Sequence, residues 1–156
     1  MSTDLVPLFP LHTVLFPRMP LPLHIFEERY KKMVQRCLRE QIPFGVVLIR
    51  EGEEVGGAAV PESVGTLARI HAIKRLSDGR MNILVIGTER FHLLEHYADR
   101  EPYLVGITEP LHDLPGDPEA LNSLTAEVTA LFHDYFQALI AQAGVQLPNY
   151  ELPTNA

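Results

Sequence analysis

Apolar and polar positions change their spacing several times along the chain. The first apolar segment, from Leu5 to Phe26, consists of short bursts interrupted by prolines at Pro7, Pro10, Pro17, Pro20 and Pro22. Proline removes a backbone donor and breaks helices, so this pattern predicts short strands at a sheet edge or a barrel rim. Residues 27–40 then repeat their apolar positions three and four apart, which predicts one amphipathic helix with an acidic start.

The middle of the chain has the pattern of a β-protein. Residues 44–49 form a continuous apolar run that is typical of a fully buried strand. The turn Ser77-Asp78-Gly79 separates two strand-like segments, 64–76 and 81–87, and therefore predicts a hairpin. Further strands are expected at 90–94 and 103–108. About six or seven strands, mostly sequential and antiparallel, are enough to close a small barrel.

The C-terminal part predicts one long helix. Asp117 is a good N-cap and Pro118 a good first helical residue, and we expect the helix to stop at Gly144. Its length is roughly 40 Å, which is longer than a small barrel is wide. The apolar stripe along this helix therefore requires a second copy, a partner or a further C-terminal extension to cover it. A homodimer through this helix is one prediction. The apolar stripe consists of Leu121, Leu124, Val128, Leu131, Phe132, Tyr135, Phe136, Leu139 and Ile140.

Length and composition limit the classes of protein that this chain can represent. Its 156 residues, 46% hydrophobic and 21% charged, suit one globular domain with a helical extension and exclude a multidomain enzyme. We assign residues 1–112 to the barrel and 113–156 to the extension. The prolines exclude a membrane helix at the N-terminus. The N-terminus also lacks the features of a secretory signal, so we expect a cytoplasmic protein without a membrane partner.

The charge and the single cysteine narrow the choice of ligands. A formal net charge of −7 repels phosphate backbones, so nucleic acid is not the expected partner. Cys37 is the only cysteine, which excludes an internal disulfide and a cysteine-rich zinc site. It falls in the helical pattern of residues 27–40, and we interpret it as structural.

One motif suggests catalysis. His92-Leu93-Leu94-Glu95-His96 matches the H-x-x-E-H pattern of inverted zinc peptidases. That chemistry needs a helix, whereas this segment continues a strand pattern in which the two histidines would stand roughly 13 Å apart. The sequence contains neither a phosphate-binding loop nor a Gly-x-Ser-x-Gly elbow. We therefore expect no enzyme activity, catalytic residue, metal or cofactor, and keep a zinc hydrolase using His92, Glu95 and His96 as the last alternative.

The most informative feature is a long ordered string near the N-terminus. It runs Pro7-Leu8-Phe9-Pro10-Leu11, Val14-Leu15-Phe16-Pro17, Met19, Leu21-Pro22-Leu23, Ile25-Phe26-Glu27 and Arg29-Tyr30, and continues through Phe44-Gly45-Val46-Val47, Val64-Gly65-Thr66-Leu67-Ala68 and Gly87-Thr88-Glu89-Arg90-Phe91. The string resembles the N-terminal substrate-binding domain of the ATP-dependent Lon protease, over roughly residues 5 to 110. The family's ATPase and Ser-Lys protease segments have no counterpart here, so the chain is similar to stand-alone bacterial Lon-domain proteins.

The resemblance implies a fold, a function and candidate residues. The implied fold is a PUA-like β pseudo-barrel followed by helices, here by one long C-terminal helix. The implied function is non-catalytic binding of unfolded or damaged polypeptides, or of one dedicated protein partner. Binding would use an exposed strand edge or an apolar groove. A PUA-like RNA-binding domain is the alternative, although the acidic balance and the lack of a basic-aromatic surface oppose it.

Six residues are candidate polypeptide contacts. Phe16, Met19 and Leu21 lie between prolines, where the chain is least fully paired, and core packing is the competing interpretation for them. Arg29, Tyr30 and Arg90 match the family's strings. For these three, together with Glu27, the competing interpretation is a structural ion pair and an aromatic anchor that joins the helix to the barrel.

Overall fold

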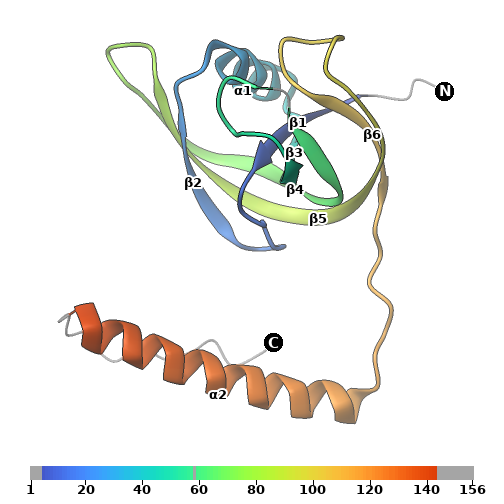
Figure 1. The fold of residues 1–156 in the computed structure, drawn as a ribbon, viewed down its shortest axis with the longest axis vertical. Helices are drawn as coiled ribbons and strands as arrows, with labels where there is room; N and C mark the ends of the chain where they lie inside the picture. Colours follow the sequence, from blue (N-terminus) through green and yellow to red (C-terminus); the bar gives the residue numbers. More distant parts are fainter. Residues whose placement is uncertain (1–4, 58, 144–156) are drawn as a thin grey trace. The chain divides into compact units, whose positions relative to one another are not determined.

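The computed structural model describes residues 5–57 and 59–143. The chain forms two compact units, Met1–His112 and Asp113–Ala156, which we call the barrel unit and the helical unit. The described part of the barrel unit contains six strands and one helix, and that of the helical unit one long helix (Figure 1). The predicted fold class, mostly β with helices, is confirmed. The assignment of residues 1–112 to a barrel domain and of 113–156 to a helical extension stays a prediction.

The elements follow one another in an order close to the predicted one. The barrel unit contains β1 (Val6–Leu11), β2 (Pro20–Ile25), α1 (Glu28–Glu40), β3 (Phe44–Glu51), β4 (Val60–Arg75), β5 (Met81–Tyr97) and β6 (Val105–Pro110). The β4–β5 turn is the predicted hairpin: Gly79 has a φ of 82°, and the Asp78 carboxylate accepts the Arg80 N–H at 3.1 Å. Asp-Gly is favoured at such turns because glycine adopts positive φ without steric cost.

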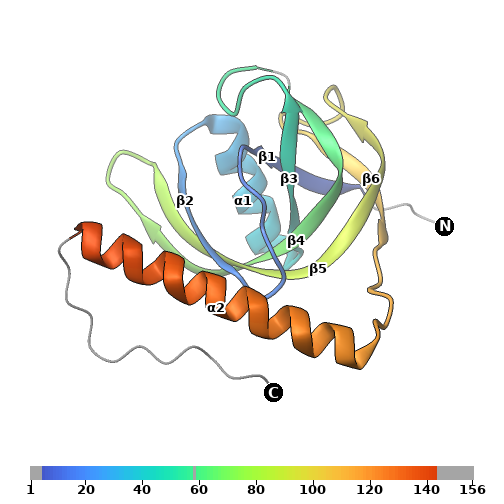
Figure 2. The same ribbon diagram turned by 60° about the horizontal axis from the view of Figure 1, so that its bottom comes forward.

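The six strands form one sheet that closes on itself. Its order is β2-β5-β4-β3-β1-β6, and β5 also pairs with β6. The first part of β5 pairs with β2, from Met81 to Ile86, and its last part pairs with β6, from Phe91 to Tyr97. The length of β5, 17 residues, allows it to serve both neighbours. Five strands therefore close the barrel, with β2 added at one edge (Figure 2).

One pairing departs from the mostly sequential and antiparallel pattern, and two details of the prediction are wrong. β1 pairs in parallel with β3, for example Leu8 with Gly45, because the chain crosses through β2 and α1 between these strands instead of making a hairpin. The segments 81–87 and 90–94 belong to the single strand β5. Residues 14–17 form a loop and not a strand, with the Leu15 side chain buried and its carbonyl accepting the Thr66 hydroxyl at 2.6 Å.

The barrel core is completed by α1. Tyr30, Met33, Val34 and Cys37 are its buried residues, at the three-and-four spacing that the sequence predicts. A second, smaller cluster surrounds Phe91. Gly45 and Gly65 lie so close to this ring that a Cβ at either position would approach it to 2.7 and 2.4 Å. These glycines therefore make room for the aromatic side chain.

The helical unit contains α2 (Pro118–Ala143). The Asp117 carboxylate accepts the Ala120 N–H at 3.1 Å, which confirms the predicted cap. The predicted stop at Gly144 and the tail beyond it lie outside the described residues. No helix in the described ranges is long and apolar enough to cross a membrane. The large apolar side chains that α2 exposes are Leu121, Leu124, Val128, Leu131, Phe132, Tyr135 and Leu139.

Candidate functional site

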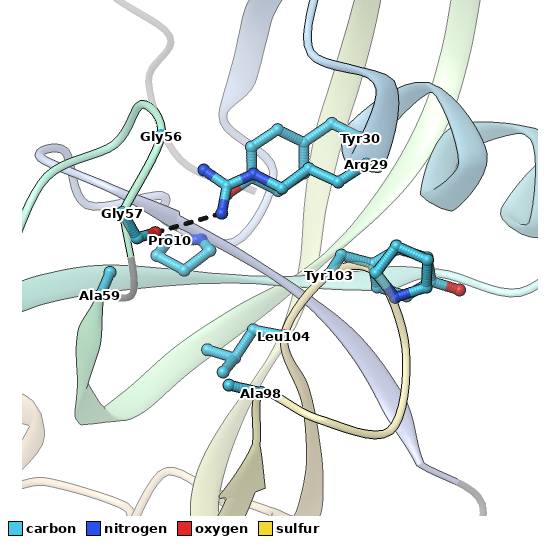
Figure 3. A pocket seen from close by; sticks show the side chains of 10 residues that line it. Pro10, Arg29, Tyr30, Gly56, Gly57, Ala59, Ala98, Tyr103 and Leu104 are labelled. Carbon is cyan, nitrogen blue, oxygen red and sulfur yellow. Dashed lines mark hydrogen bonds between the residues drawn. The ribbon is translucent and has the colours of Figure 1, made fainter.

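Two hollows lie on either side of the loop between β3 and β4. The first, which we call the apolar hollow, has a volume of about 160 Å³ and is lined by β1, β2 and the loop, including Leu23, Phe26 and Val55. The second, which we call the arginine hollow, has a volume of about 270 Å³ and is lined by Arg29, Gly56, Gly57 and Leu104 among others (Figure 3). Tyr30 lines both.

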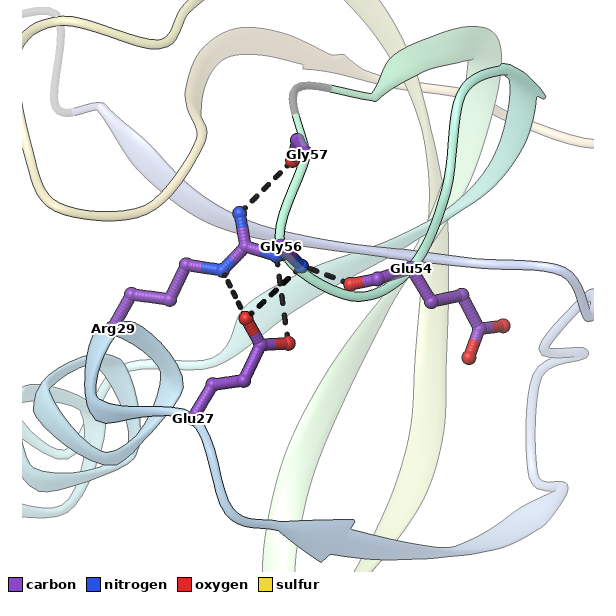
Figure 4. Close-up of polar contacts among 5 residues, drawn as sticks. All are labelled: Glu27, Arg29, Glu54, Gly56 and Gly57. Carbon is purple, nitrogen blue, oxygen red and sulfur yellow. Dashed lines mark hydrogen bonds and ion pairs between the residues drawn. The ribbon is translucent and has the colours of Figure 1, made fainter.

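Arg29 fastens the loop to the start of α1. Its guanidinium donates to the Glu27 carboxylate from Nε at 3.0 Å and from Nη2 at 3.4 Å. It also donates to the carbonyl oxygens of Glu54, at 3.1 Å, and Gly57, at 3.2 Å (Figure 4). The Glu27 carboxylate accepts the Gly56 N–H at 3.4 Å. The planar guanidinium presents several donors in a fixed geometry, so one side chain holds two points of the loop.

The start of α1 explains why these residues meet. Glu27 occupies the N-cap position with extended backbone angles, and its carbonyl accepts the N–H groups of Tyr30 and Lys31. Its side chain makes no helix-capping bond and points to Arg29 instead. The Arg29 guanidinium carbon also lies 4.6 Å from the centre of the Tyr30 ring. The first turn of α1 therefore presents cation, carboxylate and aromatic ring together.

Tyr30 joins this cluster to the core. Its ring centre lies 4.2 Å from that of Phe9, and only 5% of the residue is exposed. Burial raises the pKa of the Tyr30 hydroxyl to about 12. The structural interpretation of Glu27, Arg29 and Tyr30, an ion pair and an aromatic anchor between helix and barrel, agrees with these contacts. The same side chains form the walls of the two hollows.

The six candidate contacts do not form one site. Arg29 and Tyr30 lie together at the hollows. Phe16 is 62% exposed in the loop between β1 and β2, whereas Met19 and Leu21 are half-buried and pack against the main core. Arg90 lies on β5, where its carbonyl accepts the Leu111 N–H at 3.0 Å. The competing interpretation, core packing, therefore accounts for much of the burial of Met19 and Leu21.

The sequence interpretation missed the exposed apolar residues at the hollows. Phe26 is 45% and Val55 56% exposed, and both line the apolar hollow. Val55 is an apolar residue between two acidic residues and two glycines, which was a usable signal. The predicted strand 103–108 begins two residues too early, because Tyr103 and Leu104 precede β6 and line the arginine hollow.

The open edge of β2 offers few donors for an added strand. The Met19 carbonyl accepts the Gly87 N–H at 3.0 Å. Met19 and every second residue after it therefore direct their backbone groups to β5. Pro20, Pro22 and His24 alternate with these residues, so their backbone groups point away from β5. Two of these three are prolines without an N–H group. Such an edge resists pairing with another chain, which favours the groove over the strand edge as a binding mode.

The motif from His92 to His96 lies in strand β5 and not in a helix. His92 Nδ1 lies 3.3 Å from the Glu109 carboxylate, and the residues that the structure describes contain no group of three or more potential metal ligands. Cys37 is buried, and burial raises the pKa of its thiol to about 11, which disfavours the reactive thiolate.

The barrel unit is thus a closed β-barrel with α1 packed against its core and two hollows beside the loop between β3 and β4. The family model of the ATP-dependent protease La (LON) substrate-binding domain matches residues 5–155. The chain belongs to this family.

Relatives and solved structures agree with this assignment. The chain is 32% identical over 110 residues to the Lon protease of Anaeromyxobacter dehalogenans, which covers 69% of this chain and 13% of that protein. It is 26% identical over 135 residues to the Lon protease of Syntrophus aciditrophicus, covering 83% and 17% of the two chains. The chain thus spans a small part of these relatives.

Two solved structures share the fold. The Lon N-terminal domain protein from Xanthomonas campestris has a TM-score of 0.63 at 34% identity, and the match covers 82% of this chain and 74% of that one. The N-terminal domain of the Lon protease from the Mycobacterium avium complex has a TM-score of 0.69 at 18% identity, covering 90% and 72%. The second likeness concerns the fold alone.

Proposed function

We propose that this protein is a non-catalytic module that binds extended polypeptide segments with exposed apolar side chains, through the apolar and arginine hollows. The observation that carries the proposal is the exposure of Phe26 and Val55 at the rim of a hollow whose walls are largely apolar. Membership of the Lon substrate-binding family supports the polypeptide as ligand. The proposed clients are unfolded or damaged polypeptides in the cytoplasm.

The two hollows suit an extended chain better than a folded surface. Each is small, so each accommodates one or two side chains, and full burial of one large apolar side chain contributes about 1.5–3 kcal/mol. Two such contacts compensate for only part of the ordering cost of a flexible peptide. Weak and sequence-tolerant binding follows, which is what a receptor for many unfolded chains requires.

Retention on the immobilised protein tests this proposal. A model protein is offered in denatured and native forms to the wild type and to a Phe26→Ser/Val55→Ser double variant. Val64→Ser, which removes an apolar side chain exposed to a similar degree on β4, is the matched control. We expect selective retention of the denatured form by the wild type and the control, and its loss in the double variant. Equal retention by all three would contradict the assignment of the hollows.

Phe16 has a separate test, because it is the most exposed large apolar residue of the barrel unit among those described. We propose it, with Met19 and Leu21, as a second contact region at the loop between β1 and β2. Phe16→Ser leaves the core intact, whereas Met19→Ser also removes core packing. If Phe16→Ser retains the denatured protein as well as the wild type does, this second region is excluded.

We propose that a second copy of the chain covers the exposed apolar side chains of α2. Leu121, Val128 and Tyr135 are spaced by seven residues, and so are Leu124 and Leu131 between them. Such a heptad repeat over several turns favours packing against another helix of the same pattern. We expect a dimer in sedimentation experiments and a monomer for Leu131→Asp. A monomeric wild type would instead favour a dedicated partner or a further C-terminal segment.

A further inference from the structure

A third hollow suggests which polypeptides the site prefers. It has a volume of about 480 Å³, is lined along α1, and shares Pro102 and Tyr103 with the arginine hollow. We infer that the protein prefers extended polypeptides that carry an acidic side chain about three residues away from their apolar anchor. The inference rests on the proposed function, and concerns the chemistry of the bound segment.

The charges of this third hollow, which we call the basic hollow, favour an anion. Lys32, Arg36 and Arg39 line it together with Glu40 and Glu101. Three cations and two carboxylates leave one net positive charge there, although the whole chain has a net charge of −7. An acidic side chain bound here gains attraction, whereas a basic one is repelled.

The cations differ in how freely they can meet a ligand. Arg36 is held in place, since its Nε donates to the Glu40 carboxylate at 2.9 Å and its Nη1 to the Tyr103 hydroxyl at 3.3 Å. Arg39 donates to the other oxygen of Glu40 at 2.8 Å. Lys32 is exposed and forms no salt bridge within the described ranges. Lys32 is therefore the cation most available to an incoming carboxylate.

Helix geometry gives the spacing. Arg29 and Tyr30 line the arginine hollow, and the basic residues of the third hollow centre about six residues later on α1. At about 1.5 Å per residue this separation is roughly 10 Å along the helix axis. An extended peptide covers the same distance with about three residues, at roughly 3.3 Å each. An apolar side chain in the arginine hollow then places an acidic one, about three positions away, over the centre of the basic hollow, which Lys32 lines.

Binding of short fluorescein-labelled peptides, followed by anisotropy at low salt, tests the inference. One peptide contains a Phe-Leu pair with Asp about three positions away. A second has Asn in its place, a third has Lys, and a fourth moves the Asp to roughly six positions. Each is made in both chain orders. We expect the first peptide to bind roughly two- to five-fold more tightly than the second, in one order at least, and the third to bind most weakly.

Two variants locate the effect. Lys32→Gln should abolish the preference for Asp over Asn, while Lys74→Gln, an exposed lysine of β4 that lines none of the three hollows, should retain it. The preference should also decline as salt is raised. Equal affinity for Asp and Asn peptides would overturn the inference and leave the proposed function standing. Absence of binding by every peptide would overturn both.

Discussion

Replacing Arg29 by alanine should release the loop between β3 and β4 from the start of α1. The variant loses two bonds to the Glu27 carboxylate and one each to the carbonyl oxygens of Glu54 and Gly57. It also leaves the Glu27 carboxylate without its cation. The loop separates the two hollows, so both their shape and the stability of the barrel unit depend on this one side chain.

The expected loss is about 2 kcal/mol in the free energy of unfolding. An exposed ion pair contributes about 0.2–1 kcal/mol, and breaking a fully buried one costs about 3–5 kcal/mol. The side chains of Arg29 and Glu27 are 25% and 18% exposed, so this pair falls between the two limits. Glu27→Ala should cost less than Arg29→Ala, because Arg29 also holds the two loop carbonyls. Arg29→Lys should recover only part of the lost free energy of unfolding, since an ammonium group lacks the planar, forked arrangement of donors that a guanidinium has.

Urea denaturation followed by circular dichroism measures these changes, and hydrogen exchange reports on the amide groups of residues 52–57. The double variant Glu27→Ala/Arg29→Ala completes a mutant cycle, for which we expect a coupling energy of about 1 kcal/mol. Arg39→Ala is the matched control, because its side chain on the same helix is 71% exposed, and it should cost less than about 0.5 kcal/mol. Additive single variants with unchanged exchange in the loop would refute the anchoring role of Arg29.

Two further predictions concern the core. Gly65→Ala should destabilise the barrel by about 1–3 kcal/mol, because the new Cβ would stand 2.4 Å from the Phe91 ring; Gly57→Ala, with nothing within 4 Å, should be nearly neutral in the same urea titration. Stability should also decline as pH rises from about 9 to 11. The Cys37 pKa is raised from 9.0 to about 11 by burial, so the unfolded state loses its proton first and becomes favoured; Cys37→Ala should flatten this part of the pH profile, and an unchanged slope would contradict it.

The sequence by itself determined the local elements, because short-range chemistry sets them. The helix from residue 28 to 40 follows from apolar spacing, the start of α2 from Asp117 and Pro118, and the β4–β5 turn from Asp78 and Gly79. Membership of the family followed from the proline-rich string near the N-terminus, whose order and spacing are long enough to be specific. The strand periodicity of the sequence likewise excluded a helical zinc motif at residues 92–96.

Only the tertiary structure decided which distant segments meet. Parallel pairing of β1 with β3 and the use of one long strand, β5, by both β2 and β6 depend on the closed barrel and leave no mark in local periodicity. The hollows depend on Arg29 reaching a loop that lies 25 to 28 residues further along the chain. Hydrophobic spacing records which face of an element is buried, but it does not record which element lies against that face. The candidate site is therefore a product of the closed barrel.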